Sequence, residues 1–433
     1  MSESVPAEIV VGGGRPLRGR LRVPGDKSIS HRALLFAAMA DGESTISHLA
    51  TGADVEATAR AIAALGVTVT KRDGVVEVRS RGIDGWREPA DLIDCANSGT
   101  TMRVLSGALA GRAFLTVLTG DESLRARPMG RVAEPLRAMG ARVDGRDDGT
   151  RAPLAVRGGA LRGVRYELPV ASAQVKSALV LAGLQATGTT EIVSPAASRD
   201  HTERMLAALD APVSVDGLCV RVTRGAPRPL ELEVPGDPSS AAFLAVAAAI
   251  TPGSDIVIES VSCNPTRVGF VDVLRRMGAL VELAPTGEVC GEPVGELRVR
   301  ASSLRGTTIG GAEIPNVIDE IPALAIAAAF ADGVTDIRDA EELVVKESNR
   351  IGTLAHELEA LGIGVETRAD GLVVRGGRPV AGTFDSHGDH RIAMAVAVGA
   401  HALEGQSTVR GWSAVAASYP EFAADLLRLT GGT

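Results

Sequence analysis

Residues 24–32 read Pro24-Gly25-Asp26-Lys27-Ser28-Ile29-Ser30-His31-Arg32 and run directly into an apolar, alanine-rich segment. Turn-forming Pro, Gly and Asp before an apolar run predict a turn that opens a helix. The same opening returns as Pro235-Gly236-Asp237-Pro238-Ser239, again before an alanine-rich segment. One such turn is common, but two copies that open matching segments indicate a duplicated architecture.

A helix ending recurs between and beyond these turns, roughly every 70 residues. In each copy a helix-like run ends in Leu or Met, and a Gly and a strand-like start follow. Glycine suits this place because it adopts the left-handed conformation that closes a helix. The copies lie at Gly66, Gly140, Gly278 and Gly362, with a degenerate copy at Asp210 and a truncated one at Gly431.

A short polar cluster that opens an apolar helix keeps the same spacing. The openings lie at Ser28, Gly99, Ala173, Ser239, Glu320 and His390. Because the two series interleave in phase, we expect six units, three in each of two domains, and an α/β (α+β) fold. Crossings at the Pro-Gly-Asp turns predict a first domain over residues 23–235 and a second formed by residues 1–22 and 236–433.

Composition excludes several classes of function. The 433 residues carry a net charge of −8 and only 3% aromatic residues, which disfavours nucleic-acid and membrane-surface binding. The longest apolar run, residues 241–250, is too short to span a bilayer. The start of the chain does not resemble a signal peptide, and the four cysteines form no C-x-x-C pair. We therefore expect a cytoplasmic protein.

Basic side chains gather at the predicted helix starts. A helix N-terminus attracts anions because its N–H groups are unpaired and carry partial positive charge. Arginine adds bidentate binding of phosphate and carboxylate groups. The basic residues in these places are Lys27, Arg32, Arg127, Lys346, Arg350 and Arg391. They predict a pocket for small polyanionic molecules, although each start alone could be a capped helix with solvated charges.

Local spacing adds three expectations. Ser28 is expected to cap the helix that carries Arg32, and Pro128 is expected to be a first helical residue. Lys346, Glu347 and Arg350 are spaced to share one helical face, either for binding or as an intrahelical salt-bridge ladder.

Two carboxylates, Asp319 and Glu347, accompany the basic residues and could serve acid/base chemistry. The stretch His387-Gly388-Asp389-His390-Arg391 has H-x-x-H spacing, but it lacks a third ligand cluster and Arg391 repels a cation. Asp389 is expected to cap a helix instead. No nucleotide-binding loop or hydrolase triad motif is present, so we expect neither a metal nor a cofactor.

Eight stretches resemble the 5-enolpyruvylshikimate-3-phosphate synthases, a family of enolpyruvyl transferases, and keep the family order from about residue 20 to 422. They are residues 24–32, 97–103, 127–129, 172–174, 199–203, 235–240, 345–348 and 388–391. The resemblance implies an inside-out α/β barrel in each of two domains, built from six βαβαββ units, and domains that close over the substrates. It also implies that a monomeric enzyme transfers the enolpyruvyl group of phosphoenolpyruvate to the 5-hydroxyl of shikimate 3-phosphate and releases phosphate.

The resemblance assigns substrate contacts by position. Shikimate 3-phosphate is expected to contact Lys27, Ser28, Arg32, Ser172, Ala173, Gln174, Arg199, Asp319 and Lys346. Phosphoenolpyruvate is expected to contact Lys27, Asn97, Gly99, Arg127, Gln174, Glu347, Arg350 and Arg391, with His390 nearby. The expected catalytic residues are Lys27, Asp319 and Glu347. Glu347 would protonate the methylene carbon, and Asp319 and Lys27 would handle the hydroxyl proton.

Three positions depart from patterns common in the family. Ala96 stands where Gly often occurs, and Asn349 stands where Asp is common. Ala417 replaces a lysine of some members, which removes one basic contact to phosphoenolpyruvate. Gly99 followed by Thr100 resembles glyphosate-sensitive members, so we expect glyphosate to compete with phosphoenolpyruvate.

Three alternatives compete with this interpretation. UDP-N-acetylglucosamine enolpyruvyl transferases share the fold, but they use a loop cysteine, and residues 125–131 contain none. A paralogue acting on another hydroxylated phosphate remains open from the sequence. A binding protein without activity would lose the charged residues, yet those at positions 27, 127, 319, 347, 350 and 391 are all present.

Overall fold

The computed structural model describes residues 5–431 and divides the chain into two compact units. Unit 1 comprises Met1–Pro24, Pro235–Gly287 and Pro293–Thr433, and unit 2 comprises Gly25–Val234 and Glu288–Glu292. Each unit has its own hydrophobic core. No sequence pattern pointed to the short segment Glu288–Glu292.

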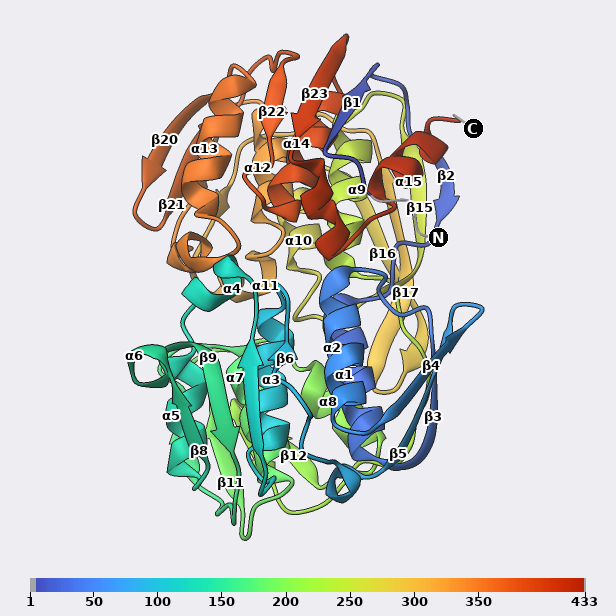
Figure 1. Cartoon of the computed structure of the whole chain (residues 1–433). Helices are drawn as coiled ribbons and strands as arrows, with labels where there is room; N and C mark the ends of the chain where they lie inside the picture. Colours follow the sequence, from blue (N-terminus) through green and yellow to red (C-terminus); the bar gives the residue numbers. More distant parts are fainter. Residues whose placement is uncertain (1–4, 432–433) are drawn as a thin grey trace. The chain divides into compact units, whose positions relative to one another are not determined.

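Unit 2 contains three four-stranded sheets (Figure 1). Their strands are β3 (Asp41–Ser47), β4 (Thr68–Arg72), β5 (Val75–Arg81), β6 (Ile93–Asp94), β7 (Leu115–Thr119), β8 (Arg142–Gly145), β9 (Arg151–Arg157), β10 (Arg165–Glu167), β11 (Thr190–Val193), β12 (Val213–Asp216), β13 (Cys219–Val222) and β14 (Glu231–Glu233). The strand orders are β14-β3-β5-β4, β6-β7-β9-β8 and β10-β11-β13-β12. In each sheet the first pair is parallel and the following pairs are antiparallel, so one pattern is used three times.

Unit 1 repeats this pattern. Its strands are β1 (Glu8–Gly12), β2 (Arg18–Leu21), β15 (Asp255–Ser262), β16 (Leu280–Val289), β17 (Glu292–Arg300), β18 (Thr308–Ile309), β19 (Val334–Ile337), β20 (Gly364–Arg368), β21 (Gly371–Arg375), β22 (Thr383–Asp385) and β23 (Gln406–Arg410). The orders are β16-β17-β15-β2, β18-β19-β21-β20 and β1-β23-β22. In the three-stranded sheet, β1 pairs antiparallel with β23, and β22 pairs parallel with it.

An apolar helix accompanies each sheet. These helices are α1 (Lys27–Met39), α3 (Gly99–Leu109) and α7 (Ala173–Gly183) in unit 2, and α9 (Pro238–Ile250), α12 (Ile321–Ala329) and α14 (His390–His401) in unit 1. They are buried almost throughout because they are apolar on all sides. In unit 1 the three pack against one another, and in unit 2 α3 packs against α1 and α7. All six begin within one residue of the predicted openings, which are confirmed.

A more polar, amphipathic helix completes each repeat. These helices are α2 (Ala53–Ala64), α5 (Gly130–Ala138), α8 (His201–Ala208), α10 (Gly269–Arg276), α13 (Arg350–Ala360) and α15 (Phe422–Leu429). Two positions after the last residue of each helix lies a residue with positive φ: Gly66 (90°), Gly140 (108°), Asp210 (58°), Gly278 (91°), Gly362 (79°) and Gly431 (74°). The six predicted helix endings are therefore confirmed, including the degenerate copy, because aspartate tolerates the left-handed region better than most residues.

Shorter helices connect these elements: α4 (Glu122–Ala126), α6 (Arg146–Gly149), α11 (Ile314–Val317), and the 3-10 helices η1 (Ile83–Gly85), η2 (Gly311–Glu313), η3 (Glu341–Val345) and η4 (Trp412–Ala417). Within residues 5–431, every helix is too short or too polar to cross a bilayer.

The two Pro-Gly-Asp turns mark where the chain passes from one unit to the other. β2 precedes the first turn and pairs with β15 of unit 1, whereas α1 after the turn belongs to unit 2. β14 precedes the second turn and pairs with β3 of unit 2, whereas α9 belongs to unit 1. A Cβ at Gly25 would lie 1.9 Å from the carbonyl oxygen of His48, so the turn has no space for a side chain. This close backbone approach explains the glycine.

Candidate active site

Lys27 is the first residue of α1. Asp26 caps this helix, since its carboxylate accepts the Ile29 N–H at 2.9 Å. The expectation that Ser28 is the cap is wrong, because the helix begins one residue earlier and Ser28 lies inside it. Lys27 Nζ donates to Asp54 Oδ2 at 2.8 Å, and both side chains are largely buried. Asp54 therefore holds the ammonium group of Lys27 at the helix N-terminus. The sequence did not indicate this partner.

Arg32 lies one turn later and is buried. Its Nε donates to Thr202 Oγ1 at 2.7 Å, Nη2 to Ser177 Oγ at 2.7 Å, and Nη1 to the Ser28 carbonyl at 2.9 Å. Burial lowers the pKa of Arg32 to about 10, so it remains charged at neutral pH. The structure thus joins Arg32 and Ser28 through the Ser28 carbonyl oxygen and holds the guanidinium in one orientation.

A buried ion pair lies near Arg32. Lys176 Nζ lies 2.6 Å from Glu203 Oε1, and neither side chain is more than 6% exposed. The negative charge of Glu203 favours the charged form of Arg32, whereas Arg199 opposes it. Both members of the pair were missed by sequence reasoning, because Lys176 lies in the interior of an apolar helix and Glu203 in the first turn of another.

His31 is fully buried, and the charges of Asp54, Lys27 and Arg32 act on its imidazole ring. Its Nδ1 lies 2.7 Å from Thr58 Oγ1, while Nε2 is buried without a hydrogen-bond partner among the described residues. Burial lowers the pKa of His31 to about 3, so the imidazole is neutral in the folded protein at physiological pH.

The side chains of Asn97 and Arg127 lie together near the N-terminus of α3. Arg127 Nη2 donates to Asn97 Oδ1 at 2.5 Å, and Asn97 Nδ2 donates to Asp121 Oδ2 at 2.7 Å. Arg127 follows the last residue of α4, and α5 begins only at Gly130. The expectation that Pro128 is a first helical residue is therefore wrong.

Gly99 begins α3 beside two arginines. A Cβ at Gly99 would lie 2.8 Å from Arg103 Nη1 and 3.5 Å from Arg127 Nη1. Arg103 Nη1 donates to Gln174 Oε1 at 2.6 Å, and Gln174 Nε2 donates to Thr100 Oγ1 at 2.9 Å. Gln174 therefore links the starts of α3 and α7, where guanidinium groups and helix N–H groups together suit an anion.

The start of α7 carries the remaining predicted residues of this region. Ser172 caps the helix by accepting the Val175 N–H at 3.4 Å, and Ala173 is the first helical residue. Arg199, half-buried, precedes α8. Unit 2 thus contains the starts of α1, α3 and α7 and eight polar or charged side chains that the sequence had selected: Lys27, Ser28, Arg32, Asn97, Arg127, Ser172, Gln174 and Arg199.

Arg350 is the centre of the predicted group in unit 1. Its Nε donates to Asp389 Oδ2 at 2.8 Å and its Nη2 to Glu347 Oε2 at 2.5 Å. Nη1 lies 3.4 Å from Asp319 Oδ1. Burial alone would lower the pKa of Arg350, but the carboxylates of Asp389 and Glu347 outweigh burial and raise it. Arg350 in turn keeps the pKa of Asp389 below its ordinary value despite burial.

Asp319 contacts two further cations. Lys346 Nζ lies 3.4 Å from Asp319 Oδ1, and Arg391 Nη1 donates to the Asp319 carbonyl at 2.7 Å. Helix α13 begins at Arg350, and the preceding 3-10 helix ends at Val345. Lys346 therefore does not share a helical face with Arg350 as expected. Lys346 reaches the Asp319 carboxylate from the segment between the two helices, and Arg350 reaches it from the first residue of α13.

Asp389 does more than the predicted capping. It accepts the Arg391 N–H at 2.9 Å as the cap of α14, which is confirmed, and it also accepts from Ser348 Oγ at 3.2 Å. Its ion pair with Arg350 was missed, since the two lie 39 residues apart. His390 is buried beside it. The sequence contains one indication of this pairing, which is that Asp389 stands at a predicted helix start near Arg391.

At the second Pro-Gly-Asp turn the cation is Arg267, which comes from outside the turn, whereas the first turn is followed directly by Lys27. Arg267 Nη2 donates to Asp237 Oδ1 and to Ser239 Oγ, each at 2.9 Å. Ser239 Oγ donates to Glu320, which is fully buried. These charges bind one another inside unit 1, so this turn has a structural role and differs from its counterpart at Lys27.

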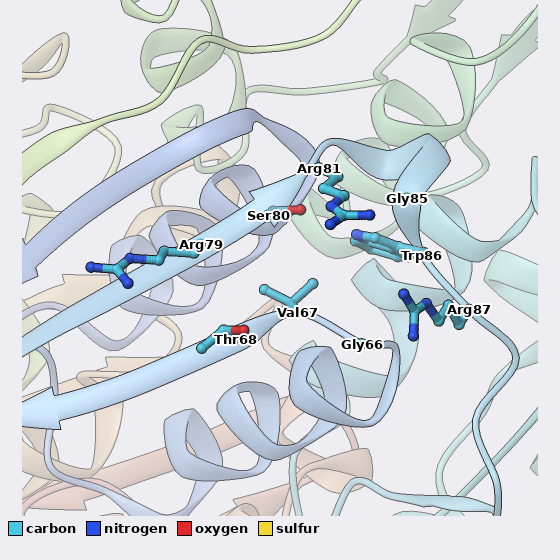
Figure 2. Close-up of a pocket in the computed structure, with 9 residues that line it drawn as sticks. All are labelled: Gly66, Val67, Thr68, Arg79, Ser80, Arg81, Gly85, Trp86 and Arg87. Atoms are coloured by element: carbon cyan, nitrogen blue, oxygen red, sulfur yellow. The ribbon is translucent and has the colours of Figure 1, made fainter.

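A surface pocket of about 290 Å³ lies elsewhere in unit 2, around β4, β5 and η1 (Figure 2). It is lined by Arg79, Arg81, Trp86 and Arg87 among others and contains none of the predicted site residues. Trp86 Nε1 donates to the Ala38 carbonyl at 2.9 Å, so the indole ring is part of the core. The pocket offers no acid/base group.

Comparison with known proteins identifies the family. Residues 11–426 match the family described as EPSP synthase (3-phosphoshikimate 1-carboxyvinyltransferase). The chain is 52% identical over 422 residues to 3-phosphoshikimate 1-carboxyvinyltransferase of Synechococcus sp., covering 96% of this chain and 95% of the relative. It is 54% identical over 413 residues to the enzyme of that name from Chloroflexus aurantiacus, covering 94% and 95%.

Solved structures agree. An EPSP synthase from Acinetobacter baumannii has a TM-score of 0.87 and 40% identity, with 97% of each chain covered. The enolpyruvyl transferase NikO from Streptomyces tendae has the same fold, with a TM-score of 0.80, 21% identity, and 99% and 98% of the two chains covered. The two-domain fold of six repeated units is thereby confirmed. The chain belongs to the EPSP synthase (3-phosphoshikimate 1-carboxyvinyltransferase) family.

Proposed function

We propose that this protein transfers the enolpyruvyl group of phosphoenolpyruvate to the 5-hydroxyl group of shikimate 3-phosphate and releases inorganic phosphate. The observation that carries the proposal is the sequence identity of 52% and 54% to two proteins named 3-phosphoshikimate 1-carboxyvinyltransferase, over nearly the whole chain. The charged side chains described above provide the groups that this reaction needs.

The proposed chemistry is addition followed by elimination. A proton adds to the methylene carbon of phosphoenolpyruvate, and the 5-hydroxyl oxygen attacks the adjacent carbon while losing its own proton. A tetrahedral ketal phosphate results. A methyl proton then leaves, the C–O bond to phosphate breaks, and the methylene group forms again. Neither substrate is oxidised or reduced overall, so the reaction requires no electron carrier.

Unit 1 supplies the proposed acid and base. Glu347 is proposed as the donor to the methylene carbon. Its carboxylate forms an ion pair with Arg350 in the free protein, and a substrate anion that draws Arg350 to itself would release this carboxyl group for proton transfer. Asp319 is proposed to accept the hydroxyl proton. Lys346, Arg350 and Arg391 would balance charge on phosphate and carboxylate groups as the intermediate forms.

Unit 2 supplies the proposed anion-binding groups at three helix starts. Lys27 and Arg32 are proposed to bind shikimate 3-phosphate, together with Ser28, Ser172, Ala173, Gln174 and Arg199. Asn97, Gly99 and Arg127 are proposed to bind phosphoenolpyruvate. The ion pair of Lys27 with Asp54 and the three hydrogen bonds of Arg32 support these roles, since they orient both cations before a ligand arrives.

The acceptor is the part of the proposal that fold alone does not decide. An enolpyruvyl transferase that is only 21% identical has the same fold. The much higher identity to 3-phosphoshikimate enzymes favours shikimate 3-phosphate over UDP-N-acetylglucosamine or another hydroxylated phosphate. We further propose a cytoplasmic, monomeric enzyme that works without a cofactor.

Phosphate release with alternative acceptors tests the function. The protein is mixed with phosphoenolpyruvate and one of three acceptors: shikimate 3-phosphate, shikimate or UDP-N-acetylglucosamine. We expect rapid release only with the first. Lys27→Met should abolish it, whereas Lys71→Met, which removes an exposed lysine on β4, should not. Release with UDP-N-acetylglucosamine alone, or with no acceptor, would overturn the proposal.

A further inference from the structure

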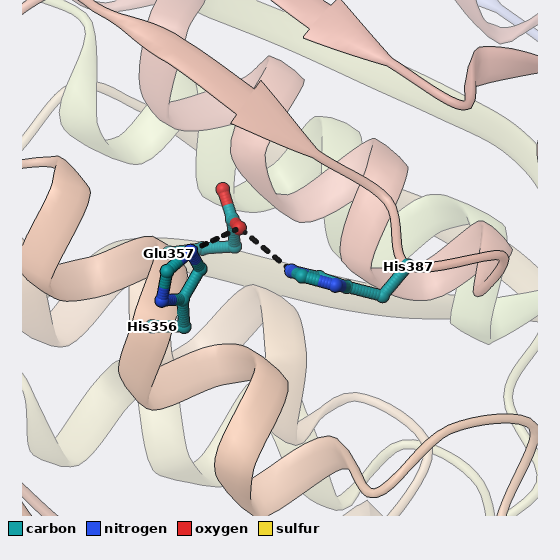
Figure 3. Close-up of side chains that lie close together, drawn as sticks. All are labelled: His356, Glu357 and His387. Atoms are coloured by element: carbon teal, nitrogen blue, oxygen red, sulfur yellow. Dashed lines mark hydrogen bonds and ion pairs between the residues drawn. The ribbon is translucent and has the colours of Figure 1, made fainter.

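His356, Glu357 and His387 form a cluster in unit 1 (Figure 3). The first two lie near the end of α13, and His387 lies in the turn before α14. His387 Nε2 is 2.9 Å from Glu357 Oε1, and His356 Nε2 is 3.9 Å from the same oxygen. Figure 3 shows both imidazole rings beside this carboxylate. The three ligand atoms lie within 4.8 Å of one another.

The carboxylate at the centre is held in place. The Glu357 side chain is only 2% exposed, and its Oε2 accepts the Asp385 N–H at 3.0 Å. The backbone N–H of His387 in turn donates to Asp385 Oδ1 at 2.7 Å, so Asp385 connects the turn that carries His387 to the Glu357 carboxylate. His356 and His387 are 70% and 34% exposed. An ion from solvent can therefore reach two imidazole nitrogens beside a preoriented oxygen.

The ligand types and distances suit zinc. Zinc binds imidazole nitrogen and carboxylate oxygen at about 2.0–2.2 Å in tetrahedral geometry, which places neighbouring ligand atoms about 3.3 Å apart. The two measured distances, 2.9 and 3.9 Å, lie on either side of that value. A small rotation of the exposed His356 ring would bring its nitrogen closer. Three protein ligands leave one tetrahedral position for water.

We propose that His356, Glu357 and His387 bind one Zn²⁺ ion, which links α13 to the turn before α14. The sequence did not suggest this site, because His387 lies 30 residues from Glu357 and no ligand spacing joins them. α13 begins with Arg350 and α14 is capped by Asp389, so a bound ion would add a second link between helices that already share an ion pair. The site contains none of the residues proposed to bind substrates, and its function is to stabilise this helix pair.

Zinc binding to the 433-residue chain tests the proposal. Protein treated with a chelator and exchanged into metal-free buffer is titrated with Zn²⁺ by calorimetry. We expect one equivalent to bind and the melting temperature to rise. His356→Gln should weaken binding about 100-fold, because loss of a residue that only hydrogen-bonds to a metal ligand already costs about 10- to 100-fold. Glu359→Gln removes an exposed carboxylate of the same helix and should leave binding unchanged.

A spectroscopic readout separates this site from adventitious binding. Co²⁺ bound by two nitrogens and a carboxylate in tetrahedral geometry absorbs in the visible range, and this band should be absent in His356→Gln. The proposal is overturned if the wild-type protein binds no zinc, or if His356→Gln binds Zn²⁺ as tightly as the wild-type protein. Because the His356 side chain is 70% exposed, its replacement should leave the protein folded.

Discussion

Gly99→Ala adds one methyl group where α3 begins. The new Cβ would lie 2.8 Å from Arg103 Nη1, which is too close for a non-bonded pair, so Arg103 must move. Movement weakens the 2.6 Å hydrogen bond from Arg103 to Gln174. Hydrogen bonds to charged groups contribute about 1.5–3 kcal/mol. We therefore expect kcat/KM for phosphoenolpyruvate to fall roughly 10- to 150-fold.

Steady-state kinetics at saturating shikimate 3-phosphate measure this effect. We expect KM for phosphoenolpyruvate to rise, while the free energy of unfolding in urea stays the same or increases, because alanine favours helix over glycine. Gly352→Ala is the matched control. It makes the same change in the first turn of α13, where the nearest atom to the new Cβ lies 3.7 Å away, and it should leave the kinetics unchanged.

A folded Gly99→Ala protein whose kcat/KM is within about twofold of wild type would refute the reasoning. It would show that phosphoenolpyruvate does not bind beside Gly99, or that Arg103 moves without consequence for the site.

Asp389→Asn leaves the buried Arg350 beside a neutral amide, so we expect urea denaturation to show a loss of about 3–5 kcal/mol; a loss below about 1 kcal/mol would contradict the ion pair. Burial lowers the pKa of His31 from 6.5 to about 3, so between these values the unfolded chain binds a proton that the folded protein does not. This contribution to stability is complete above pH 6.5 and decreases as pH falls, by about 2 kcal/mol at pH 5; identical pH dependence in His31→Gln would contradict it. Glyphosate should inhibit competitively against phosphoenolpyruvate, and insensitivity to millimolar glyphosate would contradict the room expected at Gly99.

Backbone features of the fold could be predicted from the sequence because they depend on single residues. Each predicted helix ending has a residue in the left-handed conformation, including Asp210. These positions could be predicted because glycine adopts this conformation readily and most other residue types do not. The six apolar helices could be located because each begins at a short polar cluster that is followed by a run of apolar residues. The Pro-Gly-Asp turns could be located for the same local reason.

Side-chain partners distant in the chain could not be predicted. Asp54 lies 27 residues from Lys27, and Asp389 lies 39 residues from Arg350. Their pairing depends on how neighbouring repeats pack, and no local pattern records it. The same limit explains the wrong helical face expected for Lys346, whose true partner, Asp319, lies 27 residues away.

The central chemical claim is protonation of phosphoenolpyruvate at its methylene carbon, and turnover in D₂O tests it most directly. Shikimate 3-phosphate and phosphoenolpyruvate are converted in D₂O, and the product methylene group is analysed by NMR and mass spectrometry. We predict that deuterium enters this group with the wild-type enzyme and enters far more slowly with Glu347→Gln. Product formed without deuterium would contradict addition and elimination, and unchanged incorporation in Glu347→Gln would contradict the assignment of Glu347 as the donor.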